Sequence, residues 1–308
     1  MPRSISIRMS VSASTIAVAL GLAGCASPAA DPAETPSGAS THSVVHARGE
    51  TEVPDDPQRV VVLEPVQLDT AVALDVIPVG AAVLNETAGV PAYLGDAAAD
   101  IETVGTVAEP SVERIAALQP DVIIGTESRH SGLYDQLSDI APTVFMATQT
   151  DPWQDNVALV AEALGDPDGA TELLDAYRER CDEIAAEYAT AGSTAQLIRP
   201  RDGVLTLYGP ASFAGSTLEC AGFSTPEHDW EDISLDVSPE NVLDAQADLV
   251  LVTTTDVDDE TTMPAAIVDN AASFPDVHLV DQSFWITGVG PLGGMTVLDD
   301  LERILSER

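Results

Sequence analysis

The stretch that decides the fold runs from Asp166 to Gly192 and reads DPDGATELLDAYRERCDEIAAEYATAG. Asp166 is suited to cap the first turn of a helix, Pro167 to occupy its first position, and Gly192 to end it. Apolar residues recur at helical spacing along the stretch: Ala170, Leu173, Leu174, Tyr177, Cys181, Ile184, Ala185 and Tyr188. One side of the helix must therefore lie against protein. Its length would be about 37 Å, enough to cross the backs of two small domains; a long helix within one domain is the alternative.

An internal repeat favours two domains. Ser111–Thr126 (SVERIAALQPDVIIGT) is echoed without a gap by Ser238–Thr253 (SPENVLDAQADLVLVT). The identical pairs are Ser111/Ser238, Glu113/Glu240, Gln119/Gln246, Asp121/Asp248 and Thr126/Thr253. Each copy predicts a capping serine, a short helix, an acidic turn and a buried strand of a parallel sheet. Because the copies flank the helix, the sequence predicts two similar α/β lobes joined by a single long helix.

The remaining pattern alternates strands and helices, which argues for sheets covered on both faces. Residues 44–48 are predicted to form an edge strand and residues 58–63 a buried one. In the second lobe, strands at residues 195–198 and 204–207 are separated by Asp202-Gly203, which predicts a hairpin. The last predicted helix spans residues 292–305.

Composition narrows the class of partner. The chain has 308 residues, of which 45% are hydrophobic, so it can fill two cores. Acidic residues number 51 against 12 basic ones, and every basic residue is an arginine. Nucleic acid and anionic membrane surfaces are therefore poor candidates for partners.

The N-terminus predicts export. Arg3 and Arg8 precede a short apolar run, and residues 22–25 read LAGC, which resembles the lipobox of bacterial lipoproteins. The resemblance implies cleavage before Cys25 and lipidation of that residue. Removing residues 1–24, which hold two arginines and no acids, would make the net charge of −39 two units more negative. The predicted organisation is a signal peptide (1–24), a disordered tether (25–42), an N-terminal lobe (43–165), the interdomain helix (166–192) and a C-terminal lobe (193–308).

The two other cysteines leave two readings open. Cys181 and Cys220 would lie in an oxidising compartment, where they could bridge the long helix to the second lobe. Two buried free thiols are the alternative. The sequence does not decide between them.

Five segments carry a family resemblance: RVVVLEPVQLDTAVALDVIPVG (59–80), VGTVAEPSVERIAALQPDVII (104–124), YDQLSDIAPTV (134–144), YGPASFAGSTL (208–218) and DQSFWITGVGPLGGMTVLDDL (281–301). They resemble the iron-siderophore substrate-binding lipoproteins of bacterial ABC importers. The resemblance covers nearly all of the chain after the tether. It implies two Rossmann-like lobes, a ferric siderophore as ligand and an ABC permease dimer with its ATPase as partner. No cofactor is expected, since the siderophore itself holds the iron.

Ligands of open α/β sheets lie beyond the carboxyl ends of the strands. That rule nominates Glu64, Pro65, residues 126–129, Trp153, Arg199, Tyr208, Phe284 and Trp285. Arg129 and Arg199 are favoured because each follows a predicted buried strand, and a guanidinium offers planar donors to anionic oxygens. The alternative for each is a surface ion pair. Tyr93, Trp153, Tyr208 and Trp285 are candidate walls of the ligand site, with core packing as the alternative.

Glu113 and Glu240 occupy equivalent positions in the repeat. A helix that leads into a parallel strand starts at the cleft end of its lobe, so both carboxylates are predicted on the rim. Ordinary stabilisation of a helix N-terminus is the alternative. By resemblance, these positions match the glutamates that dock onto arginines of the permease dimer, one per lobe.

Two further signals are rejected. Gly288–Gly293 satisfies GxGxxG, but too little chain follows for a second strand, so we interpret it as a loop. The acidic segment 227–232 contains His228, yet the five histidines lack metal-ligand spacing. No metal site is predicted.

Catalytic motifs are also lacking, so we expect a monomeric, lipid-anchored binding protein at the outer face of the cell membrane, not an enzyme. Alternatives are a haem, cobalamin or metal-ion binder of the same fold, or a secreted lipoprotein hydrolase. Neither the siderophore class, the extent of lobe closure nor the permease is set by the sequence.

Overall fold

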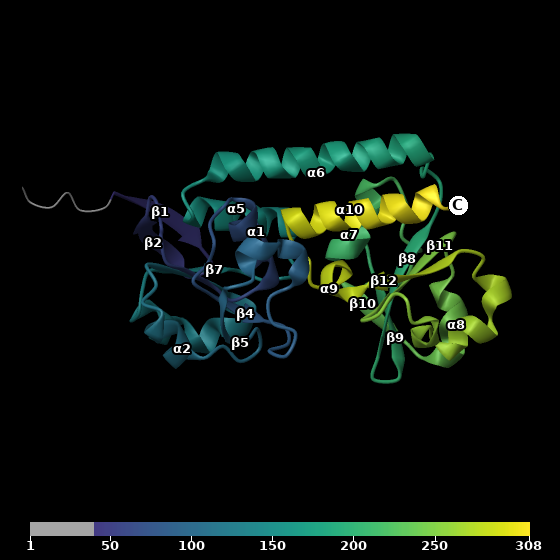
Figure 1. Cartoon of the computed structure of the whole chain (residues 1–308), viewed down its shortest axis with the longest axis horizontal. Coiled ribbons are helices and arrows are strands. Elements are labelled where there is room, and N and C mark those ends of the chain that lie inside the picture. The colour runs from purple at the N-terminus through teal and green to yellow at the C-terminus, as the bar shows by residue number, and fades with distance from the viewer. Residues whose placement is uncertain (1–39) are drawn as a thin grey trace, which may run out of the picture. The chain divides into compact units, whose positions relative to one another are not determined.

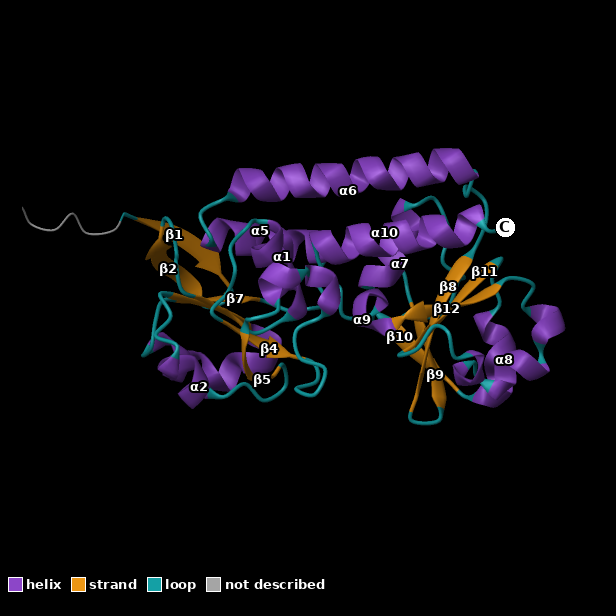
Figure 2. Ribbon diagram, viewed as in Figure 1, coloured by secondary structure: helices purple, strands orange, loops and turns teal. Residues whose placement is uncertain are grey.

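Two five-stranded sheets lie below two long helices in the computed structural model, which describes residues 40–308 (Figures 1 and 2). The predicted signal peptide, Cys25 and most of the predicted tether fall outside these residues. The strands of the sheets are β3 (Val60–Val62), β4 (Gly80–Val83), β5 (Glu102–Thr106), β6 (Val122–Thr126), β7 (Thr143–Met146), β8 (Ala195–Arg201), β9 (Val204–Tyr208), β10 (Ser234–Val237), β11 (Leu249–Thr254) and β12 (Val277–Asp281). The prediction of two α/β lobes joined by one long helix is confirmed.

The N-terminal sheet is parallel throughout, in the order β5-β4-β3-β6-β7. Its strands β3, β4, β6 and β7 are short and almost wholly buried, as expected for a parallel sheet covered on both faces. Helices α1 (Pro65–Ala73) and α5 (Trp153–Ala163) pack on one face, and α2 (Val112–Ala117) and α4 (Tyr134–Ser138) on the other. Short helices fill the connections: α3 (Glu127–His130), η1 (Ala92–Leu94), η2 (Asp96–Ala98) and η3 (Ser131–Leu133).

The C-terminal sheet has the order β10-β9-β8-β11-β12, and β9 and β10 run antiparallel to their neighbours. The predicted hairpin is confirmed: Arg201 pairs with Val204 across Asp202 and Gly203, which have φ of 49° and 83°. This hairpin is the predicted exception to the alternation of strands and helices in the second lobe. The other elements are α7 (Phe213–Cys220), η4 (Pro239–Ala245), η5 (Glu260–Thr262), α8 (Ala265–Asp269), η6 (Ala271–Ser273) and α9 (Gln282–Trp285).

The repeated aspartates perform the same task in both lobes. Asp121 accepts hydrogen bonds from the backbone N–H groups of Gln58 (2.7 Å) and Arg59 (2.9 Å), just before β3. Asp248 accepts one from the N–H of Thr194 (2.8 Å), just before β8. Each acidic turn therefore fixes the start of the central strand of its own sheet.

The repeated serines differ. Ser111 caps α2 by accepting a hydrogen bond from the N–H of Arg114 at 3.3 Å. Ser238 precedes η4 but accepts no such bond. The prediction of a second capped α-helix is wrong: Pro239 opens a 3₁₀ segment that is interrupted by non-helical backbone at Asn241.

The edge strand predicted at residues 44–48 belongs to a separate hairpin. Strands β1 (Thr41–His46) and β2 (Gly49–Pro54) pair only with each other among the described residues. The hairpin adjoins β7 through a hydrogen bond from the N–H of Ala47 to the carbonyl of Phe145 (2.9 Å). Strand β1 starts inside the predicted tether 25–42.

The interdomain helix α6 spans Pro167–Tyr188 and begins as predicted. Asp166 caps it by accepting a hydrogen bond from the N–H of Gly169 at 2.9 Å. It ends before the predicted Gly192, because Ala189 already turns left-handed at φ 49°. At the standard rise, its 22 residues span about 33 Å.

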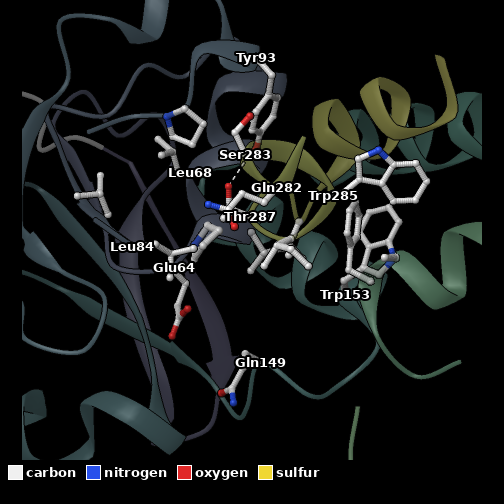
Figure 3. A pocket seen from close by; sticks show the side chains of 18 of the residues that line it. Glu64, Leu68, Leu84, Tyr93, Gln149, Trp153, Gln282, Ser283, Trp285 and Thr287 are labelled. Carbon is white, nitrogen blue, oxygen red and sulfur yellow. Dashed lines mark hydrogen bonds between the residues drawn. The ribbon is translucent and has the colours of Figure 1, made fainter. Parts of the chain in front are cut away.

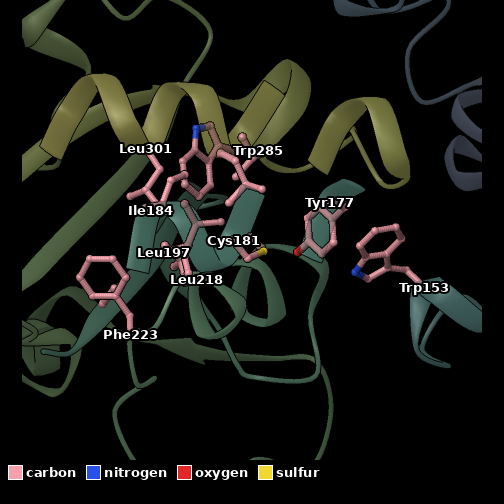
Figure 4. Close-up of a cluster of buried hydrophobic side chains, with 14 of the residues drawn as sticks. Trp153, Tyr177, Cys181, Ile184, Leu197, Leu218, Phe223, Trp285 and Leu301 are labelled. Atoms are coloured by element: carbon pink, nitrogen blue, oxygen red, sulfur yellow. The ribbon is translucent and has the colours of Figure 1, made fainter. Parts of the chain in front are cut away.

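A second long helix, α10 (Pro291–Ser306), lies alongside α6 and reaches α1 and η1 of the N-terminal lobe (Figure 1). The buried side of α6 packs with α10, α7, Trp153 and Trp285 in one core (Figure 4). This core includes Val157 from the first lobe and Leu197 from the second. The sequence predicted helix α10 but not its contacts with both lobes.

The open question about the cysteines is settled in favour of the bridge. Cys181 of α6 and Cys220 of α7 form a disulfide with their Cα atoms 5.4 Å apart. It encloses a sequence separation of 39 residues and ties the interdomain helix to the second lobe.

Candidate functional site: a cleft between the lobes

A cleft of about 820 Å³ is lined by residues of both lobes. All six residues predicted to bind ligand line it: Tyr93, Arg129, Trp153, Arg199, Tyr208 and Trp285. Figure 3 shows the indole rings of Trp153 and Trp285 on one side of this pocket and Glu64 on the other. Of the other residues that the strand-end rule nominated, Glu64 and Pro65 also line the cleft, whereas Phe284 and residues 126–128 do not. The binding roles of the six residues stay predictions.

Arg199 is an unpaired cation in the cleft. Of the ten arginines in the described part of the chain, the other nine each form an ion pair or hydrogen bond with a neighbour. The guanidinium of Arg199 forms neither an ion pair nor a hydrogen bond with any residue described. It also lies within β8, not after it as predicted, because the hairpin carries this strand to Arg201. A ligand with anionic oxygens would supply the missing acceptor.

Arg129 lies beside a buried carboxyl group of the same lobe. Its Nε lies 2.9 Å from Oε1 of Glu64, whose side chain is only 4% exposed. Despite this ion pair, that buried oxygen accepts no hydrogen bond from any described residue. Burial raises the pKa of Glu64 to about 7, against the lowering effects of the Arg129 guanidinium and the Thr126 side chain.

Both candidate tryptophans belong to the core at the edge of the cleft. Trp285 is fully buried, and its indole N–H donates to Asp300 at 2.8 Å. Trp153 packs edge-to-face on Tyr177, with ring centroids 5.1 Å apart. The core packing considered as an alternative therefore applies to both indoles, although each also presents atoms to the cleft.

Sequence reasoning missed several polar lining residues. Asn85 follows β4, Gln149 follows β7, Thr255 follows β11 and Gln282 follows β12. The strand-end rule, applied to every strand, would have found all four. They offer amide and hydroxyl groups that can donate to, or accept from, a polar ligand.

The rejected GxGxxG segment forms the tight turn into α10. Asp69 of α1 supplies the anion at that helix N-terminus, accepting from the N–H groups of Leu292 (2.9 Å) and Gly293 (2.8 Å). It also accepts from the hydroxyl of Tyr93 at 3.0 Å. Gly290 has φ of 146°, and a Cβ there would collide with Asp69. Burial raises the pKa of Asp69 to about 7, although these three donors lower it.

The described residues offer no resident metal centre. Within 40–308, no group of three or more His, Cys, Asp and Glu side chains is arranged to hold an ion. His228, in the acidic loop, packs edge-to-face with Trp230, with ring centroids 5.1 Å apart. No helix among these residues is long and apolar enough to cross a membrane.

The two-lobed fold and the cleft define a solute-binding protein. The chain belongs to the periplasmic binding protein family, whose sequence profile matches residues 60–273.

Among its relatives, the probable siderophore-binding lipoprotein YfiY of Bacillus subtilis is 32% identical, covering 86% of this chain and 88% of that protein. The Fe(3+) dicitrate-binding periplasmic protein FecB of Escherichia coli is 32% identical over 55% of this chain and 57% of its own length. The structure of Staphylococcus aureus SirA with staphyloferrin B matches with a TM-score of 0.70 and 27% identity, covering 86% of this chain and 99% of that one.

The raised pKa of Glu64 predicts a pH-dependent effect of Glu64→Gln. A folded-state pKa near 7, above the ordinary 4.5, means that Glu64 favours folding most at low pH and that this contribution is lost as the pH rises through 7. The unfolding free energy of Glu64→Gln relative to the parent should therefore increase by roughly 1–3 kcal/mol between about pH 5 and 8.

Urea denaturation across that range measures the difference. Glu172→Gln, which removes an exposed glutamate outside the cleft, is the control for loss of one charge. A parallel pH response of parent and Glu64→Gln would show that the carboxyl of Glu64 has an ordinary pKa.

Proposed function

We propose that this protein captures a ferric siderophore in the cleft between its lobes and delivers it to an ABC permease for iron uptake. The observation that carries the proposal is Arg199, an unpaired guanidinium in a large cleft of a chain whose other described arginines are all engaged. Family membership supports it, since the B. subtilis relative is named for siderophore binding. The solved relative from S. aureus holds staphyloferrin B.

The size and lining of the cleft suit such a ligand. A volume of about 820 Å³ lies within the range of small-molecule sites, roughly 300–1,000 Å³. Aromatic and aliphatic walls would cover the apolar body of a chelator, and Arg199 with the amide side chains would contact its polar oxygens. The iron would need no protein ligand, because the chelator fills its coordination shell.

The cellular setting is part of the same proposal. Lipidation at Cys25 would hold the protein at the outer face of the cell membrane, with the permease dimer and its ATPase as partners. We infer a binding role without catalysis, because relatives across the family are binding proteins.

Tryptophan fluorescence tests ligand capture directly. Trp153 and Trp285 line the cleft, so a coloured ferric complex bound there should quench them by energy transfer. We expect saturable quenching by a ferric hydroxamate at nanomolar to micromolar concentration, and none by the iron-free chelator or by haem. Trp230→Phe should leave the quenching in place, since Trp230 does not line the cleft.

A panel of ferric hydroxamate, catecholate and carboxylate complexes, with haem, cobalamin and free ferric ion beside them, completes the test. Calorimetry on the same panel checks any complex that fails to quench. Absence of binding across all ferric siderophores would refute the proposed function. Saturable binding of haem or cobalamin alone would replace it with another ligand class.

A further inference from the structure

The charged groups of the cleft are few and nearly balanced. Five charged residues line it: Glu64, Asp151, Asp281, Arg129 and Arg199. Three acids against two arginines give the lining a formal charge of minus one at neutral pH when Glu64 is ionised. The cleft is therefore not a basic pocket in an acidic protein.

The positions of these groups divide the charge between the lobes. On the N-terminal side, the Glu64 carboxyl group faces Arg129 at 2.9 Å and, when ionised, cancels its charge. On the C-terminal side, Asp281 is engaged as the cap of α9, accepting from the N–H of Ser283 at 2.7 Å. Arg199 is then the one lining cation, among the described residues, without a carboxylate partner.

Glu64 is built into the site and not exposed on its rim. Its residue is 3% exposed, and Oε1 is buried without a hydrogen-bond partner among the described residues. Gln67, one helical turn on, holds the backbone at this point by accepting from the N–H groups of Leu63 (2.9 Å) and Glu64 (3.1 Å). A ligand that approaches Arg129 must also approach a fixed carboxylate.

Ferric siderophores differ in net charge by their chelating groups. Three singly charged hydroxamates cancel the charge of a ferric ion, whereas three doubly charged catecholates leave a net charge of minus three. Ferric complexes of polycarboxylates are also anionic. Family membership does not set the class, since the relatives include proteins named for siderophores and for ferric dicitrate.

We propose that the cleft selects ferric complexes of zero or single net charge, of the trihydroxamate class, and rejects highly anionic ferric complexes. This inference rests on the proposed function and deepens it. Arg199 can satisfy one anionic or strongly polar edge of a ligand. Further negative charge would meet the Glu64 carboxylate and Asp151 with no free cation to compensate it, and like charges brought together oppose binding.

Paired single-charge variants test the proposal. Dissociation constants for a ferric trihydroxamate and a ferric triscatecholate are measured by fluorescence quenching at about pH 8, where Glu64 is ionised. The parent should bind the trihydroxamate at least about a hundredfold more tightly. Glu64→Gln uncovers the charge of Arg129 and should narrow that ratio about tenfold. Arg199→Gln should weaken both complexes, and the anionic one more.

Matched variants separate charge from damage. Glu127→Gln removes an acid that pairs with Arg48 outside the cleft, so it should leave the ratio unchanged. Arg199→Lys keeps the charge but loses the planar guanidinium, so it should weaken both complexes and change the ratio less than Arg199→Gln does, which separates loss of charge from misfolding.

The outcomes are distinct from those of the proposed function. If the parent binds the triscatecholate as tightly as the trihydroxamate, the charge selection is overturned while siderophore binding stands. An unchanged ratio in Glu64→Gln would likewise overturn it. Failure to bind any ferric complex would instead remove the proposed function itself.

Discussion

Replacing Asp69 with alanine is expected to lower the free energy of unfolding by roughly 4–6 kcal/mol, because three buried or part-buried donors lose their acceptor at about 1–3 kcal/mol each. Those donors are the N–H groups of Leu292 and Gly293 and the hydroxyl of Tyr93. Asp69 belongs to α1 of the first lobe, whereas the N–H groups begin α10. The substitution therefore removes the polar anchor between the N-terminal lobe and the C-terminal helix.

Urea denaturation at about pH 8 measures the effect, since the pKa of Asp69 is raised to about 7 and the carboxylate prevails there. Tyr93→Phe is the matched control: it removes one donor and leaves the two backbone bonds, so a loss of about 1 kcal/mol is expected. Asp69→Asn, which keeps the shape and one acceptor oxygen, should fall between the two. An alanine variant no less stable than Tyr93→Phe would mean that Asp69 does not anchor α10.

Local signals explain why much of the fold was predictable. The cap at Asp166, Pro167 and the apolar periodicity lie within one segment, so α6 could be read directly. The Asp202-Gly203 turn carries its own backbone preference, and β8 and β9 followed from it. Asp121 and Asp248 each bind backbone N–H groups just before the central strand of their own sheet. The repeat therefore correctly indicated that the two lobes are built alike.

Long-range pairing explains what was missed. Asp69 and Leu292 are separated by 223 residues, and nothing near Asp69 marks it as the anion for α10. The contacts of α10 with the N-terminal lobe could not be predicted for the same reason, since they join residues far apart in the sequence. Similarly, Arg199 was placed after its strand because the extent of β8 depends on pairing with β9, not on its own apolar run.

The cleft was partly predictable. Topology alone sends the carboxyl ends of parallel strands to one edge, so Glu64 and Arg129 could be nominated without a structure. Tyr208 ends the antiparallel strand β9, to which this rule does not apply. Whether an arginine is paired depends on packing in space. From the sequence, a surface ion pair was an equal alternative for Arg129 and for Arg199. In the structure only Arg129 forms an ion pair.

Replacing Glu113 and Glu240 together with alanine is expected to reduce siderophore-dependent iron uptake to background while leaving the dissociation constant of the soluble protein unchanged. We propose that these glutamates dock onto arginines of the permease dimer, one from each lobe. Both are exposed, in the first turns of α2 and η4, and neither pairs with an arginine among the described residues. Glu113 accepts only from the hydroxyl of Ser111, at 3.2 Å.

The two positions also share a side of the molecule. Figure 1 shows α2 and α8 on the sides of their lobes that face away from α6, and η4 contacts α8. A surface on that side would meet the permease with the interdomain helix directed outward. Neither glutamate lines the cleft, so ligand capture should be independent of them.

Transport of radiolabelled ferric siderophore in cells that lack the native binding protein measures the effect, with fluorescence titration of the same variants beside it. The control is the pair Glu172→Ala and Glu179→Ala, two exposed glutamates of α6 that remove the same charge from the opposite side. Full uptake by the Glu113/Glu240 double variant would eliminate docking through these residues. Weakened ligand binding would place them in the capture step instead.

The single variants distinguish docking by two lobes from docking by one. When two contacts act on one rigid partner, the second forms at high effective concentration, so losing either leaves a weaker but measurable association. Each single alanine variant should therefore retain partial uptake, and the loss in the double variant should exceed either one alone. Complete loss from one single variant, with none from the other, would assign docking to one lobe and leave the repeat without a shared function.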